Sequence, residues 1–169
     1  LVIVAAEHFA NFFMNNMPAF AIGMADHYDG PIEKAWRVEA RFEPYDPPKP
    51  IKIPNILGQV SDEPSPGAVV FDWQGETHRL DTLGDPKEGL SLIFADQTNG
   101  KETYGAGRYL YAQKAGSDGI TQLDFNKAYN PPCVFTEFAT CPLPPPQNEL
   151  PIRVTAGEKD WGHGDGAHD

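Results

Sequence analysis

The stretch that decides the fold is Leu123–Leu150, LDFNKAYNPPCVFTEFATCPLPPPQNEL, which contains both cysteines of the chain and six prolines. Each proline removes a backbone N–H donor and fixes φ, and it restricts the preceding residue to extended backbone. The stretch therefore cannot form a regular helix. It predicts a strand end at Leu123–Phe125 followed by a rigid loop, because its aromatic side chains favour burial over disorder.

The composition around this stretch indicates one turn-rich domain. The chain has 169 residues, of which 16 are Gly and 17 are Pro. This content is typical of β proteins with many turns. The net charge of −11 disfavours a nucleic-acid partner, because phosphate binding needs basic stripes, and it disfavours anionic lipid surfaces.

Local patterns predict a series of short strands. In Ala35–Glu43, apolar side chains alternate with charged ones, which predicts a half-buried strand that the segment PYDPPKP then ends. Gln74–Gly75 predicts a tight hairpin turn. Further strands are expected at Ile51–Ile53, Ile56–Val60, Gly67–Trp73, Glu76–Leu83, Leu90–Ala95, Lys101–Ala112, Ile120–Phe125 and Leu150–Ala156. The predicted fold is mainly β: a single antiparallel β-sandwich or partly closed barrel.

The chain is expected to have an apolar N-terminal arm or helix (residues 1–34), a β domain (35–159) and a polar tail (160–169). Polar residues and Pro18 interrupt the arm, so it does not predict a membrane span, which needs about 20 nearly continuous apolar residues. The arm either covers the core of its own domain or docks on a partner. The predicted docking side chains fall on one helical face: Phe9, Phe12, Phe13, Met14 and Met17.

The two cysteines, Cys133 and Cys141, are close enough in sequence for one disulfide across a proline-rich loop. In a reducing compartment they would instead be buried thiols. Of the two, the bridge is the favoured prediction. Catalysis by Cys133 is disfavoured because a thiol nucleophile usually has a histidine base, and no histidine lies near it in sequence.

Polar side chains around two predicted strands form a tentative ligand-binding set. If these strands pair, Arg108 meets Asp124 and forms a strong ion pair at a small polar pocket. The alternative is that the Asx side chains only satisfy backbone groups of the loop. The predicted set is Tyr104, Arg108, Asp124, Asn126, Tyr129 and Asn130.

The tail could bind a divalent ion through His and carboxylate side chains, but its spacing matches no defined metal site. A solvated acidic tail is the preferred interpretation. We expect no metal and no cofactor, and the chain has no GxSxG elbow or dinucleotide fingerprint.

Three segments resemble a large bacterial family known as domain of unknown function sixteen-eighty-four. They are ARFEPYDPPKPIKIPNILG (Ala40–Gly58), TNGKETYGAGRYLYA (Thr98–Ala112) and LDFNKAYNPPCVFTEFATCPLPPPQNELPIRVTAGEK (Leu123–Lys159). The DFN-x-AYNPPC run followed by CPLPP is the most specific part. The resemblance covers Trp36–Lys159 and leaves the arm outside. It implies a mostly β domain, often exported, and supplies no catalytic residues.

The first functional hypothesis is a non-enzymatic accessory or interaction subunit. The arm would dock the β domain on a larger membrane-associated complex in the bacterial cell envelope or at the periplasmic face of a membrane. A cytoplasmic location is the alternative. A second hypothesis, of another class, is a small-ligand-binding domain or hydrolase with a polar pocket near Arg108 and Asp124.

Overall fold

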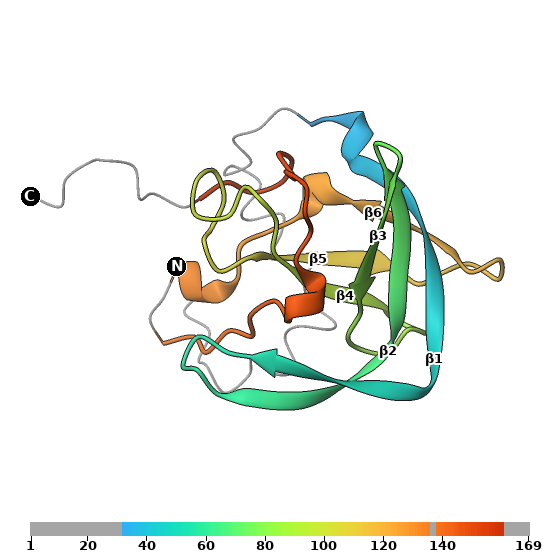
Figure 1. The fold of residues 1–169 in the computed structure, drawn as a ribbon, viewed down its shortest axis with the longest axis horizontal. Helices are drawn as coiled ribbons and strands as arrows, with labels where there is room; N and C mark the ends of the chain where they lie inside the picture. The colour runs from blue at the N-terminus through green and yellow to red at the C-terminus, as the bar shows by residue number, and fades with distance from the viewer. Residues whose placement is uncertain (1–31, 136–137, 161–169) are drawn as a thin grey trace, which may run out of the picture.

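A computed structural model describes residues 32–135 and 138–160 (Figure 1). The predicted arm up to residue 31, with its docking side chains, and the tail histidines lie outside the described residues. The predicted division into arm, domain and tail is therefore not tested.

An antiparallel sheet of four strands, in the order β3-β2-β1-β6, forms the frame of the domain. Its strands are β1 (Arg37–Pro54), β2 (Val60–Trp73), β3 (Glu76–Asp81) and β6 (Ile120–Asp124). The predicted alternation of the first strand is confirmed, since Trp36, Val38 and Ala40 are buried while the residues between them are exposed. The alternation follows from the two faces of a strand, only one of which meets the core.

β1 continues through the segment PYDPPKP, so the prediction that this segment ends the strand is wrong. The register between β1 and β2 shifts between Pro44 and Lys49, and the residues between them have no ladder partners on β2. Prolines 47 and 48 lie in this bulge, where a missing N–H breaks no ladder hydrogen bond. β2 likewise begins at Val60, earlier than expected, and Ile56–Val60 contributes mainly the turn between the two strands.

The hairpin between β2 and β3 forms at the predicted turn. Gln74 and Gly75 have φ values of 52° and 87°. Two consecutive positive φ values match the twist of the flanking strands, and glycine adopts this backbone without steric cost.

A two-stranded ribbon, β4 (Gly89–Phe94) with β5 (Arg108–Gln113), packs across the four-stranded sheet. Leu83 and Ser91 form an isolated bridge that joins the end of β3 to β4. On the other side, the Thr121 hydroxyl of β6 donates to the carbonyl of Gln113 in β5 at 2.7 Å. The sheets thus curl into a half-barrel, in which β1 and β2 run along one side and then bend around one end (Figure 1). This confirms the predicted mainly β fold in its partly closed form.

The core lies between the ribbon and the sheet. The inner face of the ribbon contributes Leu90, Leu92, Phe94, Leu110 and Ala112 to it, because alternate residues of a strand point to the same side. Aromatic side chains of the sheet complete the core. The indole of Trp36, just before β1, stacks on that of Trp73 at the end of β2, with ring centroids 4.0 Å apart.

The proline-rich stretch is ordered loop with three 3-10 helices: η4 (Phe125–Lys127), η5 (Pro132–Val134) and η6 (Pro146–Asn148). Its buried Asn148 links two strands. The Asn148 Oδ1 accepts from the N–H of Asp81, and its Nδ2 donates to the carbonyls of Asp81 and Ile93 at 2.9 Å each. The predicted strand end followed by a rigid loop is therefore confirmed for the described part of the stretch.

Two predicted strands are wrong in whole or in part. Lys101–Ala112 contains strand only from Arg108 onward, and the glycines before it lie in turns. Gly107 has a φ of 93° and follows a turn closed by its N–H and the carbonyl of Tyr104. Leu150–Ala156 forms no strand. Leu150 and Ile152 form backbone hydrogen bonds with the residues that follow β4, but the carbonyls of Val154 and Ala156 bind a buried side chain instead.

Candidate functional site

That buried side chain is Arg108, which is 0% exposed. Its Nη2 lies 2.7 Å from Asp96 Oδ2 and 2.8 Å from the carbonyl oxygen of Val154, and its Nη1 lies 2.6 Å from that of Ala156. Burial lowers the pKa of Arg108, while the Asp96 carboxylate opposes this shift. We call these four residues the Arg108 cluster. These hydrogen bonds hold β5 to the C-terminal segment. Because the Arg108 side chain is closed to solvent, the cluster offers no ligand site.

The expected pairing of Arg108 with Asp124 is corrected, since the ion pair is with Asp96. The Asp96 carboxylate is further fixed by the Thr98 N–H and hydroxyl, at 2.7 and 2.5 Å. The turn after β4 thus places the Asp96 carboxylate against the guanidinium of Arg108. Sequence reasoning missed this partner because it lies in the turn and not on the strand next to Arg108.

The predicted Asx residues mainly satisfy local backbone, which is the alternative that the sequence left open. Asp124 Oδ1 accepts from the N–H of Asn126 at 3.3 Å. The Asn126 side chain exchanges two hydrogen bonds of 3.0 Å with the backbone of Glu33. The Asn130 Nδ2 donates to the carbonyl of Lys159 at 2.7 Å. These contacts tie both ends of the domain to the loop.

The remaining two members of the predicted set, Tyr104 and Tyr129, lie at other places. Tyr129 lines a pocket, and Tyr104 contacts Cys133. The six residues are therefore not brought together around Arg108, although a ligand-binding role for Tyr129 stays a prediction.

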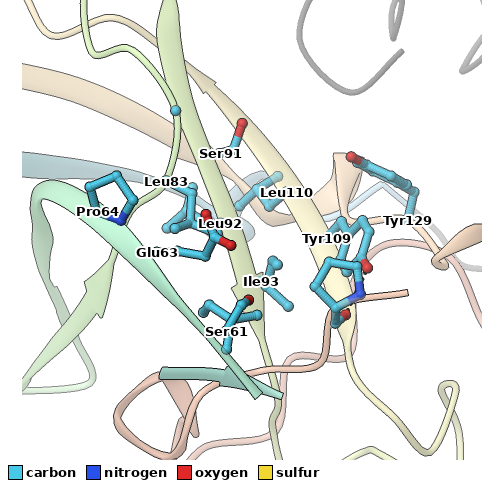
Figure 2. A pocket seen from close by; sticks show the side chains of 13 residues that line it. Ser61, Glu63, Pro64, Leu83, Ser91, Leu92, Ile93, Tyr109, Leu110 and Tyr129 are labelled. Atoms are coloured by element: carbon cyan, nitrogen blue, oxygen red, sulfur yellow. Dashed lines mark hydrogen bonds between the residues drawn. The ribbon is translucent and has the colours of Figure 1, made fainter. Parts of the chain in front are cut away.

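The pocket that Tyr129 lines has a volume of about 420 Å³ and lies between the distal end of the β1–β2 hairpin and the outer face of the ribbon (Figure 2). This volume is in the range of small-molecule sites, roughly 300–1,000 Å³. Residues of the ribbon and of the proline-rich stretch supply one wall of the pocket, and the β1–β2 hairpin supplies the other. The lining residues are Ile53, Ser61, Glu63, Pro64, Leu83, Gly84, Ser91, Leu92, Ile93, Tyr109, Leu110, Tyr129 and Pro142.

The alternation of the long hairpin decides which side chains reach the pocket. Ile53 pairs with Ser61 across the two strands, and cross-strand partners point to the same face. Glu63, two residues after Ser61, points to that face as well. The intervening pair, Lys52 and Asp62, forms an exposed ion pair at 3.2 Å on the opposite face.

Glu63 is the charged group of the pocket, and it is half-buried among apolar side chains. Across residues 32–135 and 138–160, no ion pair of Glu63 is seen. Figure 2 shows its side chain directed from β2 toward the ribbon. A carboxylate in this setting is costly to desolvate, and a cation or a hydrogen-bond donor would offset that cost.

The two cysteines lie beside the pocket, where the loop residue Pro142 accepts a hydrogen bond of 2.7 Å from the Tyr109 hydroxyl. Cys133 and Cys141 are both free thiols in the structure. The backbone N–H of Cys133 donates to Cys141 Sγ at 3.1 Å, and the Tyr104 hydroxyl lies 3.9 Å from Cys133 Sγ. The predicted disulfide is not formed here, but the two residues it requires are in contact.

Two further predictions concern metals and membranes. The described residues contain no group of three or more His, Cys, Asp or Glu side chains that could hold a metal ion. Within the same part of the chain, no helix is long and apolar enough to cross a membrane. Glu158, just before the polar tail, is buried, and its Oε2 accepts from the Asn130 N–H at 2.6 Å.

The fold and the pocket define an antiparallel half-barrel domain with a ligand-sized pocket between its long hairpin and the outer face of its ribbon. The chain belongs to the family described as Protein of unknown function (DUF1684), whose profile matches residues 27–159. This confirms the family that the sequence resembles, and the match begins within the segment assigned to the arm.

The structure is also similar to the solution NMR structure of an uncharacterized protein from Haloarcula marismortui. The two are 27% identical, with a TM-score of 0.63, and the match covers 90% of this chain and 95% of the other. Among curated proteins, no match was found.

Proposed function

We propose that this domain binds a small amphipathic molecule that has an apolar body and a cationic head group. The observation that carries the proposal is Glu63, a half-buried carboxylate without an ion pair among the described residues, facing an apolar pocket of about 420 Å³. The pocket lies away from Arg108 and Asp124, where the sequence placed it.

Each part of the pocket suits one part of such a ligand. Ile53, Leu83 and Ile93 offer apolar contact to the body, which gains about 25 cal/mol for each Å² removed from water. Glu63 accepts a hydrogen bond from the head group. The hydroxyl of Tyr129 and those of the two serines add polar contacts at the walls, as in most ligand sites.

The proposal is tested with three probes that share an octyl chain: octylammonium, octanol and octanoate. We expect octylammonium to bind most tightly and octanoate most weakly, with the methyl NMR signals of Ile53 and Ile93 shifting on titration. A charge-assisted hydrogen bond contributes roughly 1.5–3 kcal/mol, and partial exposure reduces this, so the Glu63→Gln variant should bind octylammonium about tenfold more weakly.

The matched control is Glu76→Gln, which makes the same chemical change on an exposed residue at the start of β3. It should bind all three probes as the natural chain does. Equal affinity for octylammonium and octanoate, or an unchanged preference in Glu63→Gln, would contradict the cationic head group. No shift at either isoleucine with any probe would contradict the pocket itself.

A second proposal is the accessory subunit expected from the sequence, docked on a membrane-associated complex of the cell envelope. The observation in its favour is an apolar tip on the β1–β2 hairpin, where Ile56, Leu57 and Val60 are 44%, 68% and 59% exposed. Clustered exposed apolar side chains mark protein contacts more often than isolated ones do. The tip and the arm would both bind the partner protein.

Affinity capture from the source organism tests this second proposal with three forms of the protein. The natural chain should retain one partner at constant stoichiometry. A form lacking residues 1–25 and a Leu57→Lys variant should both lose it, because one lacks the arm and the other puts a charge on the tip. Retention of the same partner by both forms would contradict the proposal.

A further inference from the structure

Cys133 and Cys141 are arranged as an unequal pair. The buried thiol of Cys141 is 2% exposed, whereas Cys133 is partly accessible. The backbone N–H of Cys133 donates to Cys141 Sγ at 3.1 Å, so the two residues are in contact. A reagent from solution therefore reaches Cys133 first, and Cys141 is already beside it.

Backbone hydrogen bonds fix the positions of both cysteines. The carbonyl of Cys141 accepts from the N–H of Ile56 at 3.1 Å, and Leu143 donates to Pro54 at 2.7 Å, so β1 fixes this side of the pair. Cys133 lies in η5, whose turn is closed by the N–H of Val134 and the carbonyl of Pro131 at 3.0 Å. The contact between Cys141 Sγ and the backbone of Cys133 is thus part of the fold.

The surroundings activate one sulfur and not the other. Hydrogen bonds from Cys141 and Tyr104 lower the pKa of Cys133 to about 7, against the opposing effect of burial. The hydrogen bond to Cys133 and burial raise the pKa of Cys141. Burial raises the pKa of Tyr104 to about 12, so its hydroxyl stays neutral and can donate to a thiolate. A thiol with a pKa near the ambient pH is the best attacking group in disulfide exchange.

We propose that Cys133 and Cys141 are a redox-active dithiol that exchanges with low-molecular-weight disulfides, with Cys133 as the attacking thiolate and Cys141 as the resolving thiol. This goes beyond the proposed ligand binding and does not depend on it. The sequence argument against a reactive Cys133 considered only a histidine base. Here a tyrosine and the second cysteine stabilise the thiolate.

The exchange proceeds in two steps. The Cys133 thiolate attacks one sulfur of a small disulfide RSSR, forming Cys133–S–S–R and releasing RS⁻. Cys141 then loses its proton to solvent, and its sulfur attacks Cys133 Sγ, forming the Cys133–Cys141 disulfide and expelling the second RS⁻. Two electrons pass from the two protein thiols to the small disulfide, and the reverse sequence reduces the protein.

Oxidised glutathione is the probe, applied to the full chain and followed by mass spectrometry. The natural chain should form the internal disulfide, and reduced glutathione should reverse it. Cys141→Ser should stop at a stable mixed disulfide on Cys133. Cys133→Ser should react more slowly, by on the order of tenfold, because the remaining thiol is buried and has a raised pKa.

The pH dependence of alkylation by iodoacetamide separates activation from mere proximity. The groups that act on Cys133 are Cys141 and Tyr104, and Asp160 and Tyr109 act on these two in turn. In the Cys141→Ser variant the rate should rise through a midpoint below that of an ordinary cysteine, about 8.5. Tyr104→Phe should move the midpoint upward, because it removes a donor to the thiolate.

Three results would overturn the proposal. The natural chain could accept glutathione without forming an internal disulfide, or form one that reduced glutathione does not reverse, which would make the bridge purely structural. An alkylation midpoint that stays the same in Tyr104→Phe would remove the tyrosine from the activation. Each of these readouts is independent of any ligand in the pocket.

Discussion

The two faces of the β4–β5 ribbon use polar residues in opposite ways. Arg108 and Tyr109 are neighbours in the chain, yet they lie on opposite faces. On the inner face, Arg108 is 0% exposed and is held by a carboxylate and backbone carbonyls. On the outer face, Tyr109 borders a pocket that contains the half-buried carboxylate of Glu63. Polar groups on the inner face therefore stabilise the fold, whereas the carboxylate facing the outer side is the one that we propose to bind a ligand.

The largest expected effect is on the inner face. Arg108→Ala should destabilise the domain by about 3–5 kcal/mol, because it leaves Asp96 as a buried charge without its partner. Urea unfolding followed by circular dichroism measures this loss.

Arg153→Ala is the control for that variant, since it breaks an ion pair with Glu102 in which the arginine is 53% exposed. An exposed pair contributes about 0–1 kcal/mol. If both variants lost the same stability, the inner face would have no special structural role.

A smaller effect is expected for Tyr109→Phe on the outer face. The substitution removes the hydrogen bond of 2.7 Å to the carbonyl of Pro142 and keeps the ring. Its cost should be about 1 kcal/mol in the same unfolding experiment. A loss as large as that of Arg108→Ala would mean that the pocket wall is as essential to the fold as the core.

The smallest effect on stability is expected for Glu63→Gln, within about 0.5 kcal/mol, as for most accessible positions without buried partners. Octylammonium binding should fall in the same variant, as proposed above. A stability loss above about 1 kcal/mol, without a change in binding, would give Glu63 a structural role and contradict the proposed difference between Glu63 and Arg108.

The features that the sequence predicts best are local ones. The alternation in Ala35–Glu43 and the Gln74–Gly75 turn depend on neighbouring residues alone, and both are confirmed. The family was also recognisable, because the Cys–Pro stretch is specific.

The predictions that failed depend on contacts distant in sequence. PYDPPKP reads as a strand end, yet β1 continues because the bulge places two of its prolines outside the ladder. The pattern of Leu150–Ala156 predicts a strand. Two of its carbonyls instead bind the guanidinium of Arg108, which lies 46 and 48 residues earlier in the sequence. No local pattern specifies either partner.

The pocket was missed for a related reason. Glu63 lies in VSDEPSPG, a run with no apolar alternation, so its inward direction emerges only from the pairing of β2 with β1. The expected set around Arg108 was polar and close in sequence. Such sets mark functional sites and structural clusters alike, and only burial separates the two.

The stacked indoles of Trp36 and Trp73 give the domain an intrinsic optical reporter. The two indoles, with centroids 4.0 Å apart and planes inclined by 14°, are close enough to couple their strong electronic transitions. We expect a paired circular dichroism signal in the far ultraviolet that neither ring produces alone. The Trp36 Nε1 also donates to the Thr155 hydroxyl at 3.1 Å. The signal therefore depends on the start of β1, the end of β2 and the C-terminal segment being assembled together, and it follows the closure of the half-barrel without any added label.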